Sequence, residues 1–344
     1  MSKRVWSFLI VIALLSGCET VPKQILIYGA PQDKVLEIHA YRVDERSRML
    51  VDVMVNGIGP FPFIIDTGAS RTLLYEDLRE ELGFEYTDDD SFFVHGAIIS
   101  QERPALAIES IAVGEIAITN VQSFSIKRPA GDEDSVARGI LGLDFLAQYA
   151  LFVDVDEQII VFAESGYTPP QKFYTSVPIV FDDLGLLDLG VPLIEARING
   201  TPIEALLDLG AERTIMNWAS ADFIGVDVRR FLRGRYEFGG IFSTIPIVAG
   251  ASGAYISIGE RFWEKMNIDI ANLPIFKTLK REDSPMMLIS AGQLRQENFI
   301  IDFPAEIFFL EADKSQRFPD LSEGECVNPN GGIISFCARP TKLR

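Results

Sequence analysis

Residues 63–69 read Phe-Ile-Ile-Asp-Thr-Gly-Ala, and residues 205–211 read Ala-Leu-Leu-Asp-Leu-Gly-Ala. Each phrase is an apolar run that ends in an aspartate, Asp66 or Asp208, followed by a glycine turn. Such a run is typical of a buried strand that leads into a tight turn. Two carboxyl groups presented in the same way in two halves of one chain predict a single active site built from two related lobes.

The repeat extends on both sides of these phrases. Before each phrase, an Asn-Gly turn (Asn56-Gly57 or Asn199-Gly200) separates two apolar runs and predicts a β-hairpin. Later in each half, residues 140–142 (Ile-Leu-Gly) correspond to residues 288–290 (Leu-Ile-Ser). These segments are 288 - 140 = 148 residues apart, and the pairs of apolar strands that follow keep the same spacing, as in 302 - 154 = 148. A constant spacing indicates duplication rather than coincidence.

Composition sets the class of protein. The chain has 344 residues, of which 48% are hydrophobic and 23% charged, so it is long enough for two domains that each bury a core. Most segments are short apolar runs between turns, and the predicted class is mainly β. Helical signal is sparse: Leu74, Leu78 and Leu82, with Gly83 as a cap, predict one short amphipathic helix.

Charge and rare residues exclude several functions. A net charge of -18 disfavours a nucleic-acid partner, because the phosphate backbone would be repelled. The two histidines, His39 and His95, lie far in sequence from Cys326 and Cys337, so we expect no metal site and no other cofactor. The same scarcity disfavours Ser-His-Asp and Cys-His mechanisms.

The N-terminus reads as a targeting signal. Lys3 and Arg4 precede an apolar run, residues 5–15, which as a helix would rise roughly 16 Å, short of the roughly 30 Å bilayer core. The run ends in Leu-Ser-Gly-Cys, which resembles the lipobox of bacterial lipoproteins and implies acylation of Cys18. Glu19 implies sorting to the outer membrane, so we expect a lipid anchor on the periplasmic face of the cell envelope. The alternative is an ordinary signal peptide with a chance cysteine.

The two remaining cysteines, Cys326 and Cys337, lie in a tail rich in Pro, Gly and Asn. In an oxidising periplasm we expect them to form one disulfide, worth on the order of 3 kcal/mol. The expected organisation, in chain order, is a signal peptide at 1–18, a first lobe at 36–165, a linker at 166–175, a second lobe at 176–313 and a tail at 314–344.

Asp66-Thr67-Gly68-Ala69, together with Ile140-Leu141-Gly142, resembles the aspartic peptidases of the retropepsin and pepsin group. The weaker second copy extends the resemblance over about residues 40 to 313. It implies a bilobal acid-protease fold, two β-barrel-like lobes with a cleft between them, and an endopeptidase that acts on peptides or unfolded proteins as a monomer.

The resemblance also implies the chemistry. Two carboxyls about 3 Å apart would repel by roughly 5 kcal/mol at an effective dielectric of about 20 if both were ionised, so Asp66 and Asp208 share one proton. The ionised member takes a proton from water, which attacks the peptide carbonyl, and the protonated member donates to the carbonyl oxygen. Which aspartate plays which part stays open.

Further site residues follow from the same resemblance. Gly68 and Gly210 let the backbone turn sharply under the carboxylates, which a Cβ would obstruct. Gly142 lies beneath the pair, and the Thr67 hydroxyl reaches across to the backbone of the other lobe. Ala69 stands where pepsins carry a serine bonded to the catalytic carboxylate, so we expect a working pH nearer neutral than that of pepsin. Substrate-covering flaps are expected at residues 92–98, with His95 and Gly96, and at residues 236–242, with Gly239 and Gly240. A turn or surface position is the alternative for His95.

The second lobe departs from the family pattern at two positions. Leu209 replaces a bracing threonine, and we expect this to leave a group unpaired at about 1 to 3 kcal/mol. Ser290 replaces a glycine, and we expect crowding that could displace Asp208. These departures motivate an alternative function, a catalytically inactive pseudo-peptidase that binds peptides or envelope proteins. In two further alternatives Asp208 is only a turn residue, or the active pair comes from the Asp66 residues of two chains.

Overall fold

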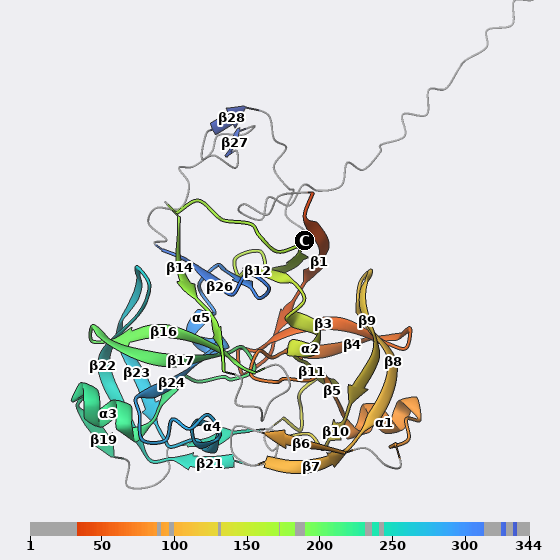
Figure 1. Cartoon of the computed structure of the whole chain (residues 1–344), viewed down its shortest axis with the longest axis horizontal. Helices are drawn as coiled ribbons and strands as arrows, with labels where there is room; N and C mark the ends of the chain where they lie inside the picture. Colours follow the sequence, from red (N-terminus) through yellow and green to blue (C-terminus); the bar gives the residue numbers. More distant parts are fainter. Residues whose placement is uncertain are drawn as a thin grey trace, which may run out of the picture.

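The computed structural model describes residues 33–87, 91–95, 100–129, 132–171, 173–182, 190–230, 236–240, 244–312, 325–327 and 333–335. The described protein is mainly β, with two lobes side by side and a third sheet joining them (Figure 1). The predicted two-lobed, mainly β class is therefore confirmed. The lipobox and Cys18 lie outside the described residues.

The first lobe is built on an eight-stranded sheet. Its central hairpin joins β3 (Met49–Val55) to β4 (Ile58–Ile65), and both turn residues, Asn56 and Gly57, have positive φ. Asn-Gly adopts this left-handed backbone at low cost, which is why the hairpin closes here. The remaining strands are β2 (Arg42–Val43), β5 (Leu73–Tyr75), β8 (Leu106–Val113), β9 (Ile116–Ser123), β10 (Ser125–Ile126) and β11 (Gly139–Leu141).

The second lobe repeats this plan. Its central hairpin joins β16 (Pro192–Ile198) to β17 (Thr201–Asp208) through Asn199 and Gly200, again with positive φ. The other strands of its eight-stranded sheet are β15 (Val180–Phe181), β18 (Ile215–Met216), β19 (Val228–Arg230), β22 (Ala249–Ile258), β23 (Arg261–Ile270) and β24 (Met286–Ser290).

A six-stranded sheet ties the lobes together. It takes β1 (Val35–Ala40), β12 (Ala150–Asp154) and β13 (Ile159–Ala163) from the first half, and β14 (Tyr174–Pro178), β25 (Phe299–Asp302) and β26 (Ile307–Glu311) from the second. At its centre β12 pairs antiparallel with β25, so that Phe152 faces Ile300. These two residues occupy equivalent positions in the repeat, and the approximate two-fold axis of the molecule therefore passes between them.

Helices are short, and one prediction about them needs correction. The predicted helix exists as α1 (Glu76–Leu82), ended by Gly83 in a left-handed conformation, but Leu74 belongs to β5 rather than to the helix. Its spacing matches the helical period, yet β5 pairs with both β10 and β11 and holds Leu74 in the sheet. The other helices are α2 (Leu143–Leu146), α3 (Trp218–Ile224), α4 (Pro274–Thr278) and α5 (Ala291–Leu294).

Two isolated hairpins stand where the flaps are predicted. The first joins β6 (Ser91–His95) to β7 (Ser100–Pro104), and the second joins β20 (Tyr236–Gly239) to β21 (Thr244–Ile247). Figure 1 shows both on the side of the lobes opposite the joining sheet. The chain crosses between the lobes from β13 to β14, so Tyr174 and Thr175, expected in the linker, are strand residues.

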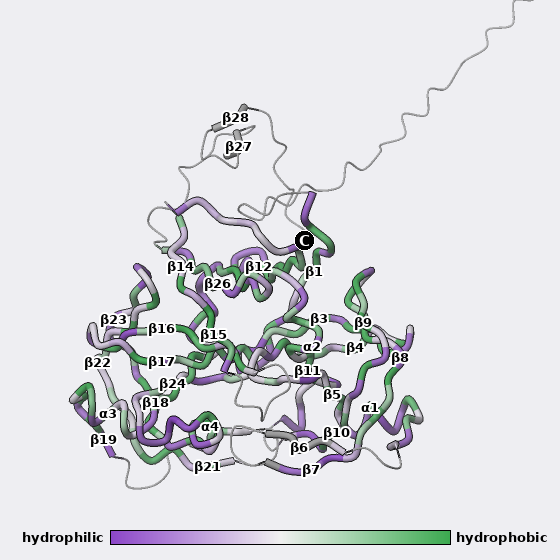
Figure 2. Tube along the Cα trace, viewed as in Figure 1, coloured by the Kyte–Doolittle hydropathy of each residue, from purple (hydrophilic) through white to green (hydrophobic). Residues whose placement is uncertain are grey.

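The interior of the lobes is continuous. One cluster of buried apolar side chains contains residues of both lobes, among them Phe63 and Leu207, and Figure 2 shows hydrophobic stretches along the strands that carry them. Each lobe is thus held against the other by shared packing, which fixes the distance between their central loops. No helix in the described residues is long and apolar enough to span a bilayer.

The tail contains one short hairpin in its described part, β27 (Glu325–Val327) with β28 (Ile333–Ser335). Cys326 lies in β27, whereas Cys337 is outside the described residues. The disulfide stays a prediction.

Candidate active site

Asp66 and Asp208 lie at the ends of equivalent strands. Asp66 directly follows β4, and Asp208 is the last residue of β17. In each lobe a parallel strand supports the end of that strand, β11 beside β4 and β24 beside β17. Each aspartate is 9% exposed, so both carboxyl groups are mostly removed from bulk water but remain reachable.

The two glycines after these aspartates show how closely the loops approach. A Cβ atom on Gly68 would lie 2.8 Å from Cγ of Asp208, and one on Gly210 would lie 2.2 Å from Cγ of Asp66. Each glycine therefore lies against the carboxyl of the opposite lobe, and any side chain there would collide with it. The structure therefore brings Asp66 and Asp208 together where the two loops meet, and both line the same cavity.

Backbone donors hold each carboxyl in the same way. The Gly68 N–H donates to Oδ1 of Asp66 at 2.8 Å, and the Gly210 N–H donates to Oδ1 of Asp208 at 2.9 Å. Ala211 adds a second donor to Asp208 at 3.0 Å. These bonds fix the carboxyl planes before any substrate binds.

Burial raises the pKa of both aspartates. For Asp208 the nearby charge of Asp66 adds to the effect of burial, and its pKa lies well above the usual value. For Asp66 burial is opposed by the Gly68 N–H, by the hydrogen bond with Asp208 and by the positive charge of Arg48. A pair of this kind holds one proton between two oxygens over a wide pH range.

Thr67 makes the interlobe contact that its position predicts. Its hydroxyl donates to the Leu207 carbonyl at 2.6 Å and accepts from the Leu209 N–H at 3.0 Å, and the side chain is fully buried. Leu209, the equivalent residue of the second lobe, has no hydroxyl and is fully buried within the apolar cluster that also contains Met49 and Phe299. Polar bracing from the first lobe is thus complemented by apolar packing from the second.

Ser290 does not crowd the site, so that expectation is wrong. Gly142 and Ser290 both have extended backbone, and each N–H donates to the hydroxyl of an equivalent threonine, Thr72 or Thr214. Asp208 keeps both of its backbone donors.

A coupled exchange explains why the serine fits. In the first lobe the Thr72 hydroxyl donates to Asp144 at 2.7 Å. Gly292 occupies the position of Asp144 in the second lobe, and there the Ser290 hydroxyl partners Thr214 at 3.2 Å. Gly142 and Asp144 of the first lobe are therefore replaced by Ser290 and Gly292 in the second. In both lobes the threonine hydroxyl has a hydrogen-bond partner, Asp144 or Ser290.

This exchange predicts unequal effects of alanine at the two positions. A Cβ on Gly142 would lie 2.4 Å from the carbonyl carbon of Arg71, so Gly142→Ala should cost about 1–3 kcal/mol or more of unfolding free energy. Ser290→Ala removes the cap to Gln293 and the Thr214 partner, and should cost about 1 kcal/mol. Urea unfolding of both variants measures the loss of unfolding free energy. Equal losses in the two variants would contradict the coupled replacement of Gly142 and Asp144 by Ser290 and Gly292.

The second predicted flap reaches the site. Phe238, Gly239 and Gly240 line the same cavity as Asp66 and Asp208, which has a volume of about 100 Å³. His95 is the last residue of β6, where it pairs with Ser100, and the position of its side chain is not described. Gly96 lies outside the described residues.

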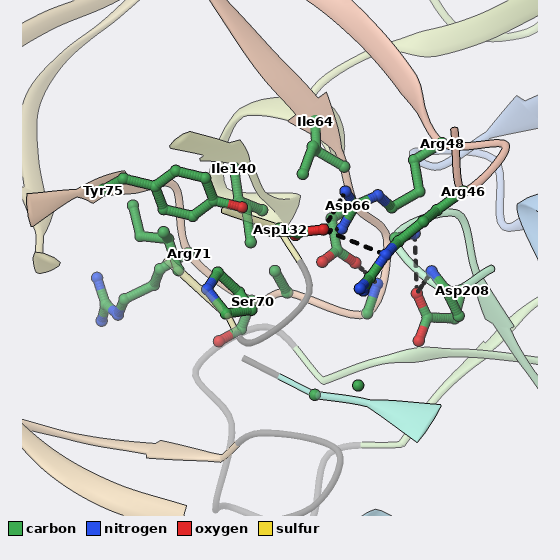
Figure 3. Close-up of a pocket in the computed structure, with 18 of the residues that line it drawn as sticks. Arg46, Arg48, Ile64, Asp66, Ser70, Arg71, Tyr75, Asp132, Ile140 and Asp208 are labelled. Atoms are coloured by element: carbon green, nitrogen blue, oxygen red, sulfur yellow. Dashed lines mark hydrogen bonds and ion pairs between the residues drawn. The ribbon is translucent and has the colours of Figure 1, made fainter. Parts of the chain in front are cut away.

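A cluster of charged side chains lies beside Asp66 and was not predicted from the sequence. Arg48, just before β3, donates to both oxygens of Asp132 at 2.8 and 2.9 Å and to Asp44 at 2.7 Å. Arg46 also reaches Asp132, at 3.3 Å. Figure 3 shows Arg46, Arg48 and Asp132 grouped around Asp66. Two arginines just before an apolar strand were the one available signal, because Asp132 is remote in sequence and belongs to no motif.

Among the described residues, no group of three or more His, Cys, Asp or Glu side chains is placed to hold a metal ion.

Comparisons with known proteins match part of the chain. Residues 51–145 match a family model described as aspartyl protease. The crystal structure of a retropepsin-like aspartic protease from Rickettsia conorii also matches, at 16% sequence identity and a TM-score of 0.28, over 37% of this chain and 91% of that one. No curated protein matches the sequence.

Proposed function

We propose that this protein, whose residues 51–145 match a family model of aspartyl proteases, is an endopeptidase that cleaves peptide bonds with water. The observation that carries this proposal is the crossed arrangement of the central loops, in which each glycine lies under the opposite carboxyl. Only small residues permit two buried aspartates to approach so closely, and their approach forces them to share a proton.

The chemistry needs a water molecule held between the two carboxyls. The ionised carboxylate takes a proton from this water, the water oxygen attacks the peptide carbonyl, and the protonated carboxyl donates to the carbonyl oxygen. The resulting diol collapses when a proton passes to the departing amine. No covalent enzyme intermediate forms, and the protein contributes orientation, exclusion of water and two proton transfers.

An extended peptide is the substrate that this site suits. The cavity at the dyad lies between the central loops and the β20–β21 hairpin, whose glycines leave room for a backbone to approach. Strand addition along such a hairpin supplies main-chain hydrogen bonds without demanding one sequence. Peptides and unfolded proteins are therefore the proposed substrate class.

The test is cleavage of an unstructured peptide library by purified protein that lacks residues 1–18. We expect internal cuts, identified by mass spectrometry, that disappear when Asp66 is replaced by Asn. Cuts that persist in Asp66→Asn would refute the assignment. Peptide binding without cleavage products at any pH tested would favour the alternative, a catalytically inactive protein that binds peptides. That alternative is now motivated by Leu209 alone, because Ser290 fits its position without displacing Asp208.

Pairing of two Asp66 residues from separate chains has little support. Asp208 already occupies the position opposite Asp66 within the same chain, next to Gly68. A covalently attached partner also has a large concentration advantage over a second chain. Activity that is independent of Asp208 and second order in protein concentration would reverse this view.

We also propose that the enzyme works in the bacterial cell envelope, anchored by acyl chains on Cys18. The support is the sequence of the N-terminus, an apolar run too short to span a bilayer that ends in Leu-Ser-Gly-Cys. Cys18→Ser should move the protein from washed membranes to the soluble periplasmic fraction. Retention of that variant in membranes would contradict the anchor.

A further inference from the structure

The two aspartate loops supply no means of deciding which carboxyl holds the shared proton. Both carboxyls accept from the N–H of the glycine that follows them. The next N–H in each loop, that of Ala69 or Ala211, also lowers the pKa of the aspartate of its own loop. Both loops continue with alanine, Ala69 or Ala211, so neither side chain donates a hydroxyl to its carboxylate. Any preference must come from charges outside the loops.

Arg48 is a charge that only the first lobe possesses. Leu50 pairs with Ile64, two residues before Asp66, and Leu193 pairs with Leu206, two residues before Asp208. Arg48 lies two residues before Leu50, and Val191 lies two residues before Leu193. Arg48 and Val191 therefore occupy equivalent positions in the repeat. Val191 is an apolar side chain, 1% exposed. The approximate symmetry of the two lobes is therefore broken at this position, by a full positive charge.

Arg48 is held firmly beside Asp66. Its guanidinium forms the paired bond to Asp132 and a further bond to Asp44, and the residue is 7% exposed. It lines the same cavity as Asp66 (Figure 3). A fixed, buried cation acts on a neighbouring carboxylate more strongly than a mobile surface charge, because less solvent screens it.

The other groups around Asp66 do not cancel this effect. Asp132, from the β10–β11 connection, is bound by Arg48 and Arg46 together. The Tyr75 hydroxyl, from β5, is buried with no hydrogen-bond partner among the described residues, and burial keeps it neutral by raising its pKa. The remaining charged residues that line the cavity are Asp208 and Arg71, and Arg71 is itself positive.

We infer that Arg48 is a positioning residue that keeps the negative charge of the free site on Asp66 and the proton on Asp208. The inference rests on the proposed function, since it makes Asp66 the base and Asp208 the acid.

The assigned roles balance through one catalytic cycle. Asp66 removes a proton from water while the water oxygen bonds to the carbonyl carbon, and the carbonyl oxygen takes the proton of Asp208. In the second step Asp66 gives its proton to the departing nitrogen as the C–N bond breaks. One hydroxyl of the diol returns a proton to Asp208 as the carbonyl reforms, and the starting state is restored.

The pH dependence of kcat/KM tests the role of Arg48. The acid limb reports protonation of the ionised aspartate, so Arg48→Gln should move this limb upward by about one pH unit, whereas Arg48→Lys should largely restore it. Asp132→Asn removes a negative charge while Asp44 still holds Arg48, and should move the limb downward. Arg42→Met, which breaks an exposed ion pair with Asp52, is the matched control and should leave the limb in place.

A second readout does not need turnover. Carboxyl ¹³C NMR of aspartate-labelled protein, assigned with Asp66→Asn and Asp208→Asn, should show Asp66 ionising first in the wild type, with its titration shifted upward in Arg48→Gln. A protein that titrates in this way but never cleaves peptides would refute the proposed function alone. A protein that cleaves peptides, with acid limbs unchanged in Arg48→Gln and Asp132→Asn, would overturn the inference alone. If Arg48→Gln fails to fold, the direction of the Asp132→Asn shift decides.

Discussion

Asp208→Asn is expected to lower kcat at least about 10³-fold while the protein stays folded. Asparagine keeps the carbonyl oxygen that accepts from Gly210 and Ala211, so the loop retains its bonds. It cannot take part in the proton transfers, and positioned acid–base groups contribute roughly 10² to 10⁴-fold each. Initial rates on a peptide identified from the library measure the loss.

The same variant should be more stable than the wild type at neutral pH. The pKa of Asp208 is raised in the folded protein, so the folded state binds its proton more tightly than the unfolded chain does. This site therefore disfavours folding as the pH rises above the unfolded value near 3.8, and has no such effect below it. Asp208→Asn should raise the unfolding temperature at pH 7 but not at pH 3. Asp52→Asn, at an exposed position, is the control for the change in unfolding temperature. For the kinetic prediction, activity of Asp208→Asn within tenfold of wild type would contradict the catalytic role of Asp208.

Thr67→Val is expected to reduce the free energy of unfolding by about 2–6 kcal/mol. Valine has the same shape but leaves the buried Leu207 carbonyl and Leu209 N–H without partners, at about 1–3 kcal/mol for each group. Because these bonds join the two lobes, kcat should fall as well, since the carboxyls lose their fixed separation. Urea unfolding and steady-state rates measure the two effects.

Thr67→Ser is the matched variant for this prediction, because it keeps the hydroxyl and removes only a methyl group. It should retain most of the stability and activity that Thr67→Val loses. Thr119→Val, on an exposed part of β9, controls for the substitution itself. A loss below about 1 kcal/mol in Thr67→Val would show that the interlobe bonds do not brace the site.

The parts of the fold that follow from local physics could be predicted from the sequence. Asn56-Gly57 and Asn199-Gly200 favour left-handed turns, and alternating apolar residues on either side fix the hairpins that end at Asp66 and Asp208. Gly68 and Gly210 were predicted for the sharp turn under each carboxylate, whereas their contact with the carboxyl of the opposite lobe is visible only in the structure. These sequence patterns act over a few residues, so they can be interpreted without knowledge of the tertiary structure.

The parts that depend on tertiary contacts could not be predicted. Leu74 satisfies a helical period, but its pairing partners in the sheet decide its conformation. Ser290 looks disruptive until Gly292 and Thr214 are seen beside it. Arg48 and Asp132 are joined across a long stretch of chain, and their meeting beside Asp66 becomes visible only when the first lobe is assembled. Departures from a family pattern therefore need to be judged together with their neighbours.

The pH dependence of kcat/KM for wild-type protein, measured between about pH 3 and pH 8, tests the shared-proton pair most directly. We predict a bell-shaped profile, because the pair has no base when both carboxyls are protonated and no acid when both are ionised. A rate that rises steadily through neutral pH, or the absence of turnover across this range, would contradict the account.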